Sequence, residues 1–236
     1  MNEIVSAVRE ELAANADEKI KNSFQKFFKE DARFYGVKSA VVARIAKKYF
    51  VEVKKLPKKE IFVLCEHFFA SGFGEDAWIA GFWADRIHEQ FTPDDFDRLE
   101  HWVGAYVDTW AKCDHLCNHA IGSFMQRYPE YVPRLKQWGK STNRWFRRAA
   151  AVSLIIPAKK GLFLDSIFEI ADILLCDNDD MVQKGYGWLL KEASREHQQE
   201  VFDYVVKHKG VMPRTALRYS VEKMPDFLRL QAMAKD

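Results

Sequence analysis

The sequence predicts an all-α protein built from stacked pairs of helices, and three features carry that prediction. Apolar residues recur at helical spacing from one end of the chain to the other, and no segment sustains the two-residue alternation of a strand. In Ile20–Phe28, for example, apolar side chains stand at positions i, i+4, i+7 and i+8, the spacing of a buried helix face. Turn residues are sparse, with 11 Gly and 7 Pro in 236 residues, too few for many tight β-hairpins.

The periodic segments place the expected helices in order along the chain. Paired helices of this length, joined by short loops and recurring about every 35–40 residues, indicate an α-solenoid. Because no internal repeat is crisp, we expect degenerate, HEAT-like repeats, with an irregular helical bundle as the competing fold. No linker or low-complexity segment marks a boundary, so we expect a single domain over residues 1–236. The expected helices lie near residues 2–15, 18–30, 39–54, 58–71, 75–90, 93–106, 110–127, 130–138, 143–156, 161–175, 179–194, 197–207, 212–222 and 224–234.

The composition argues against a secreted or membrane-spanning protein. The N-terminal segment mixes charges into its apolar pattern from the third residue, unlike a secretory signal. The longest nearly apolar run, Ala149–Ala158, contains Ser153 and Pro157 and is too short to cross a membrane. The four cysteines lack the spacing of a secreted disulfide framework, so we expect reduced thiols and a cytoplasmic location.

Charge is distributed unevenly along a chain whose net charge is only +2. Residues 1–60 hold 14 Lys/Arg against 9 Asp/Glu, residues 61–132 hold 4 against 12, and residues 133–236 hold 18 against 13. Two basic ends around an acidic middle allow a basic face to form. A solvated mosaic of charges is the simpler alternative.

The segment Asp108–Gly122 holds the most informative cluster. On a helix, Trp110, Asp114, Cys117 and Ile121 fall within one narrow stripe. A carboxylate one turn after a tryptophan needs polar partners if the stripe is buried, and is available to a ligand if the stripe lines a groove. The structural alternative is a core tryptophan with an aspartate bonded to a nearby amide or arginine.

A second cluster is basic and lies between residues 143 and 151. Arg144 and Arg148 share a helix face, with Arg147 beside them. The alanines that follow would let another helix or a nucleic-acid backbone approach closely. An earlier basic group of this kind includes Arg44, in the predicted helix 39–54.

A third cluster combines lysines with a tryptophan. Lys184, Trp188 and Lys191 stand at i, i+4 and i+7 on one stripe, which fits phosphate binding together with stacking. Gly185 and Gly187 lie inside the same predicted helix, where each weakens the helix by about 1 kcal/mol. Their presence predicts close contact with a neighbouring segment.

A metal site is the alternative reading of the first cluster. Cys113 and Cys117 stand four residues apart, as do His115 and His119, but on a helix the two pairs point about 160° apart. They cannot close around one tetrahedral zinc ion unaided. A Cys–His nucleophile is favoured still less, because no orienting third group is suggested. We therefore expect no metal and no cofactor.

In combination the three clusters resemble the AlkD-type DNA alkylation repair enzymes, a family of HEAT-like repeat DNA glycosylases. The resemblance covers about residues 20–222. It rests on the order Trp110-x3-Asp114, then Trp145-x-x-Arg148, then Gln183-Lys184-x-x-Gly187-Trp188-x-Leu190-x-Glu192. The segments Phe27-Phe28-x5-Phe34-Tyr35-Gly36-Val37 and Pro213-Arg214-x3-Arg218-Tyr219 look like the flanking motifs of that family.

The resemblance implies a HEAT-like superhelix whose basic concave face holds duplex DNA, in the cytoplasm and associated with the nucleoid when bound. It implies hydrolysis of the N-glycosidic bond of cationic N3- or N7-alkylated purines, without a deep base-flipping pocket, a cofactor, a membrane or an obligate protein partner. By position, Asp114 would be the catalytic carboxylate, and Trp110 and Trp188 the aromatic walls around the lesion. The DNA contacts expected from the clusters and the resemblance are Arg148, Arg144, Arg147, Lys184, Lys191, Phe27 and Arg44.

The sequence departs from the family pattern at two positions. Phe27 stands where the family usually has a tyrosine, and Ala111 where relatives often carry an acidic residue. Two alternatives to the enzyme are a non-catalytic binder of branched or distorted DNA and a helical-repeat scaffold for protein partners. Non-catalytic relatives tend to lose the aspartate and tryptophan pair, which this sequence keeps.

Overall fold

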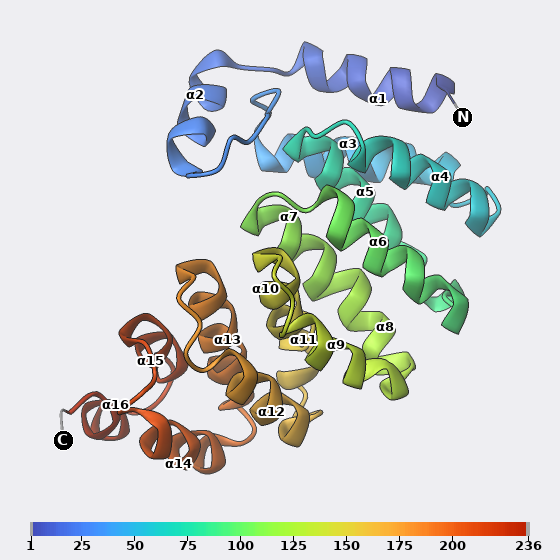
Figure 1. Cartoon of the computed structure of the whole chain (residues 1–236). Coiled ribbons are helices and arrows are strands. Elements are labelled where there is room, and N and C mark those ends of the chain that lie inside the picture. The colour runs from blue at the N-terminus through green and yellow to red at the C-terminus, as the bar shows by residue number, and fades with distance from the viewer. Residues whose placement is uncertain (1, 235–236) are drawn as a thin grey trace. The chain divides into compact units, whose positions relative to one another are not determined.

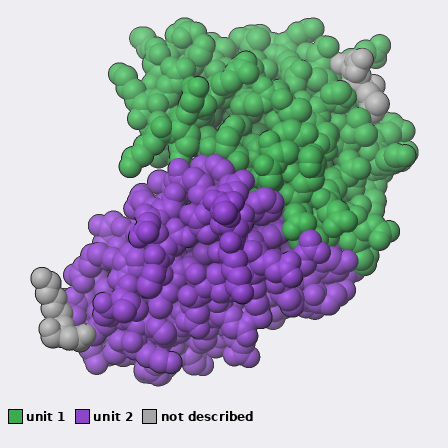
Figure 2. Space-filling model, viewed as in Figure 1, with its two compact units in different colours: residues 1–120 green, residues 121–236 purple. Residues whose placement is uncertain are grey.

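The computed structural model describes residues 2–234, and these residues are helical apart from turns and short loops (Figure 1). Within this range there is no strand, and an isolated bridge pairs Arg33 with Phe73. The all-α prediction is confirmed; residues 1, 235 and 236 of the predicted domain lie outside the described residues. No helix in residues 2–234 is both long and apolar enough to traverse a membrane. The chain divides into two compact units, residues 1–120 and residues 121–236 (Figure 2).

Unit 1 is a two-layer stack of helices. Helices α1, α4 and α6 pack in succession in one layer, and α3, α5 and α7 pack in succession in the other. Short 3₁₀ turns, His88–Gln90 and Pro93–Asp95, lead into α6. The helices of this unit are α1 (Asn2–Ala14), α2 (Glu18–Phe27), α3 (Ser39–Val53), α4 (Lys58–Phe69), α5 (Gly74–Arg86), α6 (Phe96–Tyr106) and α7 (Trp110–His115).

Unit 2 repeats this arrangement. Helices α10, α13 and α15 pack in succession, while α9 packs on α12 and α14 on α16. Consecutive helices thus form pairs that stack on the preceding pair within each unit, which confirms the predicted helical repeat. The helices are α8 (Gly122–Arg127), α9 (Val132–Trp138), α10 (Arg144–Val152), α11 (Ile155–Ala158), α12 (Leu164–Leu174), α13 (Asp180–Ala193), α14 (Gln198–His208), α15 (Arg214–Ser220) and α16 (Asp226–Met233).

Two of the predicted helices are interrupted. The predicted helix 110–127 consists of α7, a π-helical segment Leu116–Ile121, and α8. A π turn takes up extra residues, so positions after it no longer share the face of positions before it. The predicted helix 143–156 ends at Val152, because Pro157 has no N–H to donate and its ring would clash with the carbonyl of Ser153 in a continuous helix.

The glycines of α13 mark close contacts, as the sequence predicts. A Cβ on Gly187 would lie 2.8 Å from the carbonyl oxygen of Ala216 and 2.8 Å from Cβ of Tyr219, both on α15. A Cβ on Gly185 would lie 3.3 Å from Cγ of Arg148, on α10. At Gly187, helix α13 therefore lies close to the backbone of α15. At Gly185 it leaves room for the side chain of Arg148 from α10.

We expect Gly187→Ala to lower the free energy of unfolding by about 1–3 kcal/mol, because the added methyl group overlaps α15 backbone atoms that cannot move independently. Urea titration followed by circular dichroism measures this loss. Gly210→Ala is the matched control, since a Cβ there meets no atom within 4 Å. Equal stability of Gly187→Ala and wild type would contradict the close approach of α13 and α15.

Candidate functional site

Helix α7 begins at the tryptophan of the first cluster. The buried Thr109 is its N-cap, and the hydroxyl oxygen of Thr109 accepts a hydrogen bond from the backbone N–H of Lys112 at 3.3 Å. This cap fixes Trp110 as the first residue of the helix and sets Asp114 one turn later, on the final turn of α7. Both side chains are half-buried.

Trp110 lies in a cluster of aromatic rings. Its indole stacks on the ring of Phe28, with centroids 5.4 Å apart and planes 19° apart. The ring of Phe27 meets it edge-on at 5.8 Å, and Phe27 itself is 68% exposed. An apolar cavity of about 290 Å³ adjoins these rings, lined by Phe24, Phe27, Phe28, Phe34, Val37, Ser39, Val42, Gly74, Glu75, Trp78, Thr109, Trp110, Ala111, Lys112 and His115.

A buried carboxylate holds the segment that carries these rings. Glu75, at 4% exposure, accepts hydrogen bonds from the backbone N–H groups of Tyr35, Gly36 and Val37 at 3.1, 2.9 and 3.0 Å. Gly36 has a φ of 92°, in the left-handed region that favours glycine. Bonding of a carboxylate to successive N–H groups is a strong, charge-assisted arrangement. Glu75 therefore fixes the path of the chain that follows Phe28.

His115 lies on the same short helix as Asp114 and is held as a neutral ring. It stacks on Trp78 with centroids 4.8 Å apart, and its Nε2 donates to the carbonyl oxygen of Trp78 at 2.9 Å. Burial lowers the pKa of His115 to about 4, and the neighbouring His119, with its ring centroid 5.4 Å away, acts in the same direction. In residues 2–234 no three His, Cys, Asp or Glu side chains are grouped so that they could hold a metal ion.

The stripe predicted along the first cluster does not extend past α7. Trp110 and Asp114 are half-buried, whereas Cys117 and Ile121 are fully buried. The π segment begins between these two pairs, and its extra residues rotate the following positions away. Trp110 and Asp114 are therefore the two residues of the predicted stripe that are partly exposed to solvent.

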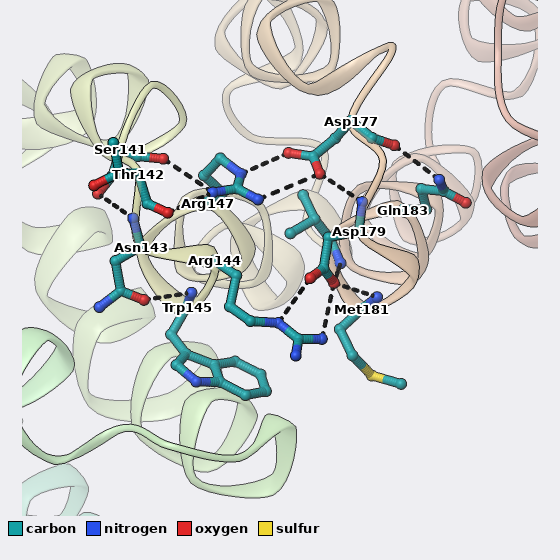
Figure 3. A network of polar contacts seen from close by, with 11 residues as sticks. Ser141, Thr142, Asn143, Arg144, Trp145, Arg147, Asp177, Asp179, Met181 and Gln183 are labelled. Carbon is teal, nitrogen blue, oxygen red and sulfur yellow. Dashed lines mark hydrogen bonds and ion pairs between the residues drawn. The ribbon is translucent and has the colours of Figure 1, made fainter. Parts of the chain in front are cut away.

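The arginines of α10 pair with carboxylates in the segment just before α13 (Figure 3). Arg144 pairs with Asp179 at 2.8 Å, and Arg147 pairs with Asp177 at 2.6 Å. Asp179 also caps α13, accepting from the N–H of Met181 at 2.8 Å. Arg147 donates in addition to the carbonyl oxygens of Ser141 and Thr142, at 3.1 and 3.0 Å.

Arg148 differs from its neighbours because it is only 5% exposed. It donates to the carbonyl oxygen of Met181 and fills the space left by Gly185. The predicted shared face of Arg144 and Arg148 thus has one half-buried and one buried member.

The predicted stripe of α13 is present, since Lys184, Trp188 and Lys191 are all half-buried. Lys184 pairs with Asp180 at 2.6 Å, and Lys191 pairs with Glu222 at 3.2 Å.

The carboxylates that pair with Arg144 and Arg147 were not predicted from the sequence, because they lie 30 or more residues away in the chain. Phe28 had no predicted role, although it is part of the flanking motif that begins at Phe27. Arg44, in unit 1, is exposed on α3.

Comparison with known proteins identifies the family. The family model described as DNA alkylation repair enzyme matches residues 8–224, so the chain belongs to that family. A solved structure described as a predicted DNA alkylation repair enzyme from Enterococcus faecalis matches with a TM-score of 0.80 and 17% sequence identity, over 90% of this chain and 98% of that one. At that identity the likeness shows a shared fold. A search of the curated proteins finds no match.

We expect His115 to make unit 1 less stable as the pH falls from about 6.5 toward 4. The pKa of the unfolded group is near 6.5 and that of the folded group near 4, so the unfolded chain binds the extra proton in this window. Between pH 7 and pH 5 the loss attributable to His115 is on the order of 1–2 kcal/mol.

Urea unfolding of wild type and His115→Gln at both pH values isolates this loss, because other titrating groups are common to the two proteins. We expect the difference in free energy of unfolding between wild type and His115→Gln to be smaller at pH 5 than at pH 7. An identical pH dependence in both would show that His115 titrates normally.

Proposed function

We propose that this protein is a DNA glycosylase that hydrolyses the N-glycosidic bond of cationic N3- or N7-alkylated purines in duplex DNA. Membership in the DNA alkylation repair enzyme family supports the substrate class. The observation that carries the chemical proposal is the pairing of Trp110 with Asp114 on α7, where a half-buried carboxylate lies one turn from an aromatic cluster.

In the proposed reaction Asp114 acts on the sugar. An alkylated purine that carries a positive charge is already an activated leaving group, so the reaction needs no general acid. As the bond to the base opens, positive charge develops on the deoxyribose. A fixed carboxylate stabilises that charge and can orient the attacking water. Removing one preorganised group of an oxyanion hole, which stabilises transition-state charge in a comparable way, typically costs about 10²–10³ in rate.

Trp110 and Trp188 are proposed to contact the cationic base. The face of a tryptophan ring attracts a cation by about 0.5–2 kcal/mol, which favours the charged lesion over a neutral purine. The stack on Phe28 fixes the plane of Trp110, and the exposed Phe27 offers an apolar surface beside it, without a hydroxyl group. This mode of selection requires no deep pocket of the kind that base-flipping enzymes use.

The phosphates are proposed to bind basic residues of both units. Arg144 and Arg147 already bind aspartates, so a phosphate that binds there would share their guanidinium donors with these carboxylates. The buried Arg148 is proposed to contribute the field of a fixed positive charge. The remaining proposed contacts are Arg44, Lys184 and Lys191. We propose that the protein acts in the cytoplasm, on the nucleoid.

We expect Asp114→Asn to reduce release of 3-methyladenine and 7-methylguanine from methylated duplex DNA by about 10² or more, because an amide cannot stabilise the developing cation. DNA binding should stay within about twofold of wild type, measured by fluorescence anisotropy, as expected for a group that acts mainly in the transition state. Asp97→Asn, which removes an exposed carboxylate on α6, is the matched control. A wild-type protein that binds DNA well and releases no base would instead be a non-catalytic binder.

We expect Lys184→Gln to reduce the slope of log affinity against log salt concentration by about 0.9, because one fewer phosphate contact releases fewer counterions. Titration of undamaged duplex DNA between low and moderate salt measures the slope. Lys59→Gln, an exposed lysine on α4, is the comparison. A slope unchanged by Lys184→Gln would remove this lysine from the proposed contacts.

A further inference from the structure

A carboxylate with no assigned role lies one turn beyond Trp188. Glu192 is 4% exposed, and its Oε1 accepts a hydrogen bond from the indole Nε1–H of Trp188 at 3.2 Å. Its Oε2 accepts from Nε of Arg195 at 2.5 Å and lies 4.0 Å from Nζ of Lys159. Glu192 therefore connects the half-buried tryptophan to two cations of unit 2.

These contacts keep Glu192 ionised although it is buried. Burial alone would raise the pKa of Glu192, but the hydrogen bonds from Arg195 and Trp188 and the charge of Lys159 outweigh it and lower the pKa. An ionised acceptor makes a stronger hydrogen bond to an indole N–H than a neutral one does. The two cations also hold the carboxylate of Glu192 in place from two sides of the chain. Arg195 follows the end of α13, and Lys159 follows the end of α11.

The hydrogen bond to Glu192 restricts the orientation of the Trp188 indole ring. A half-buried tryptophan without a partner for its N–H has several rotamers open to it. The bond to Glu192 selects the orientation in which the indole edge points along α13 toward Glu192. The position of the ring face is then fixed by the same bond.

We propose that Glu192 is a positioning residue, which holds the indole of Trp188 in the orientation that receives the cationic base. This inference rests on the proposed glycosylase activity. It assigns to Trp188 a ring fixed before DNA binds, so that binding energy is not spent on ordering it. Glu192 itself touches neither base nor sugar in this proposal.

The decisive experiment combines Glu192→Gln with Trp188→Phe. Glutamine keeps the size of the side chain and an oxygen that can accept, but removes the charge that Arg195 and Lys159 hold in place. Phenylalanine keeps an aromatic face and removes the N–H. We expect Glu192→Gln to lower single-turnover base release about tenfold in the wild-type background, with DNA affinity within about twofold. In the Trp188→Phe background the same substitution should change the rate less than twofold.

A structural reading of the same variants does not depend on activity. The indole N–H resonance of Trp188, assigned by its absence in Trp188→Phe, should shift or broaden in ¹H–¹⁵N spectra of Glu192→Gln. Glu200→Gln, which removes an exposed carboxylate on α14, should leave that resonance in place. Thermal unfolding of each variant confirms that the comparison is between folded proteins.

The possible results distinguish a failure of the positioning role of Glu192 from a failure of the proposed glycosylase activity. An unmoved Trp188 resonance in Glu192→Gln overturns the inference, whether or not the protein is active. Equal rate losses in the wild-type and Trp188→Phe backgrounds also overturn it, because Glu192 would then act on the fold and not through the indole. A wild-type protein that releases no base overturns the glycosylase proposal and with it the catalytic part of the inference, while a shifted resonance would still support the orienting bond.

Discussion

Charge that is taken out of water must be paired, and this constraint organises the functional parts of both units. Glu75, Arg148 and Glu192 are each nearly inaccessible, and each is bound by donors or acceptors from segments distant in the sequence or from the next helix turn. Removing one partner would leave a buried charge uncompensated, a change that costs several kcal/mol. The pairs thus define where the chain segments around the tryptophans must lie, as Glu75 does for the residues that follow Phe28.

The same pairing of charges reduces the positive charge of the surface that the arginines of α10 form. In unit 2, Arg144 and Arg147 face Asp179 and Asp177, so this region carries little net charge. A phosphate that binds there shares guanidinium donors with an aspartate that is already in place. The aspartates have a structural reason to be present, because Asp179 also caps α13. In the proposed contact with a DNA backbone, unit 2 would therefore offer oriented donors more than accumulated charge.

Much of this architecture could be predicted from one sequence. The helices were predictable because apolar periodicity is a local signal, and the glycines of α13 correctly indicated a close approach. The π segment after α7 could not be predicted, because an extra residue in a turn leaves the apolar pattern intact while changing the face that Cys117 presents. The pairings of Glu75 and of the α10 arginines could not be predicted either. They join residues 30 to 40 positions apart, and a single sequence carries no record of which carboxylate meets which cation.

We propose that the enzyme selects and cleaves a base because that base is positively charged. The most direct test of this proposal measures base release from matched duplexes that differ only in the lesion, one carrying 7-methylguanine and one carrying a neutral modified purine such as hypoxanthine. We expect release of the cationic base and at least about 10²-fold slower release of the neutral one, since neither Asp114 nor the tryptophans activate a neutral leaving group. Comparable release of both bases would contradict it.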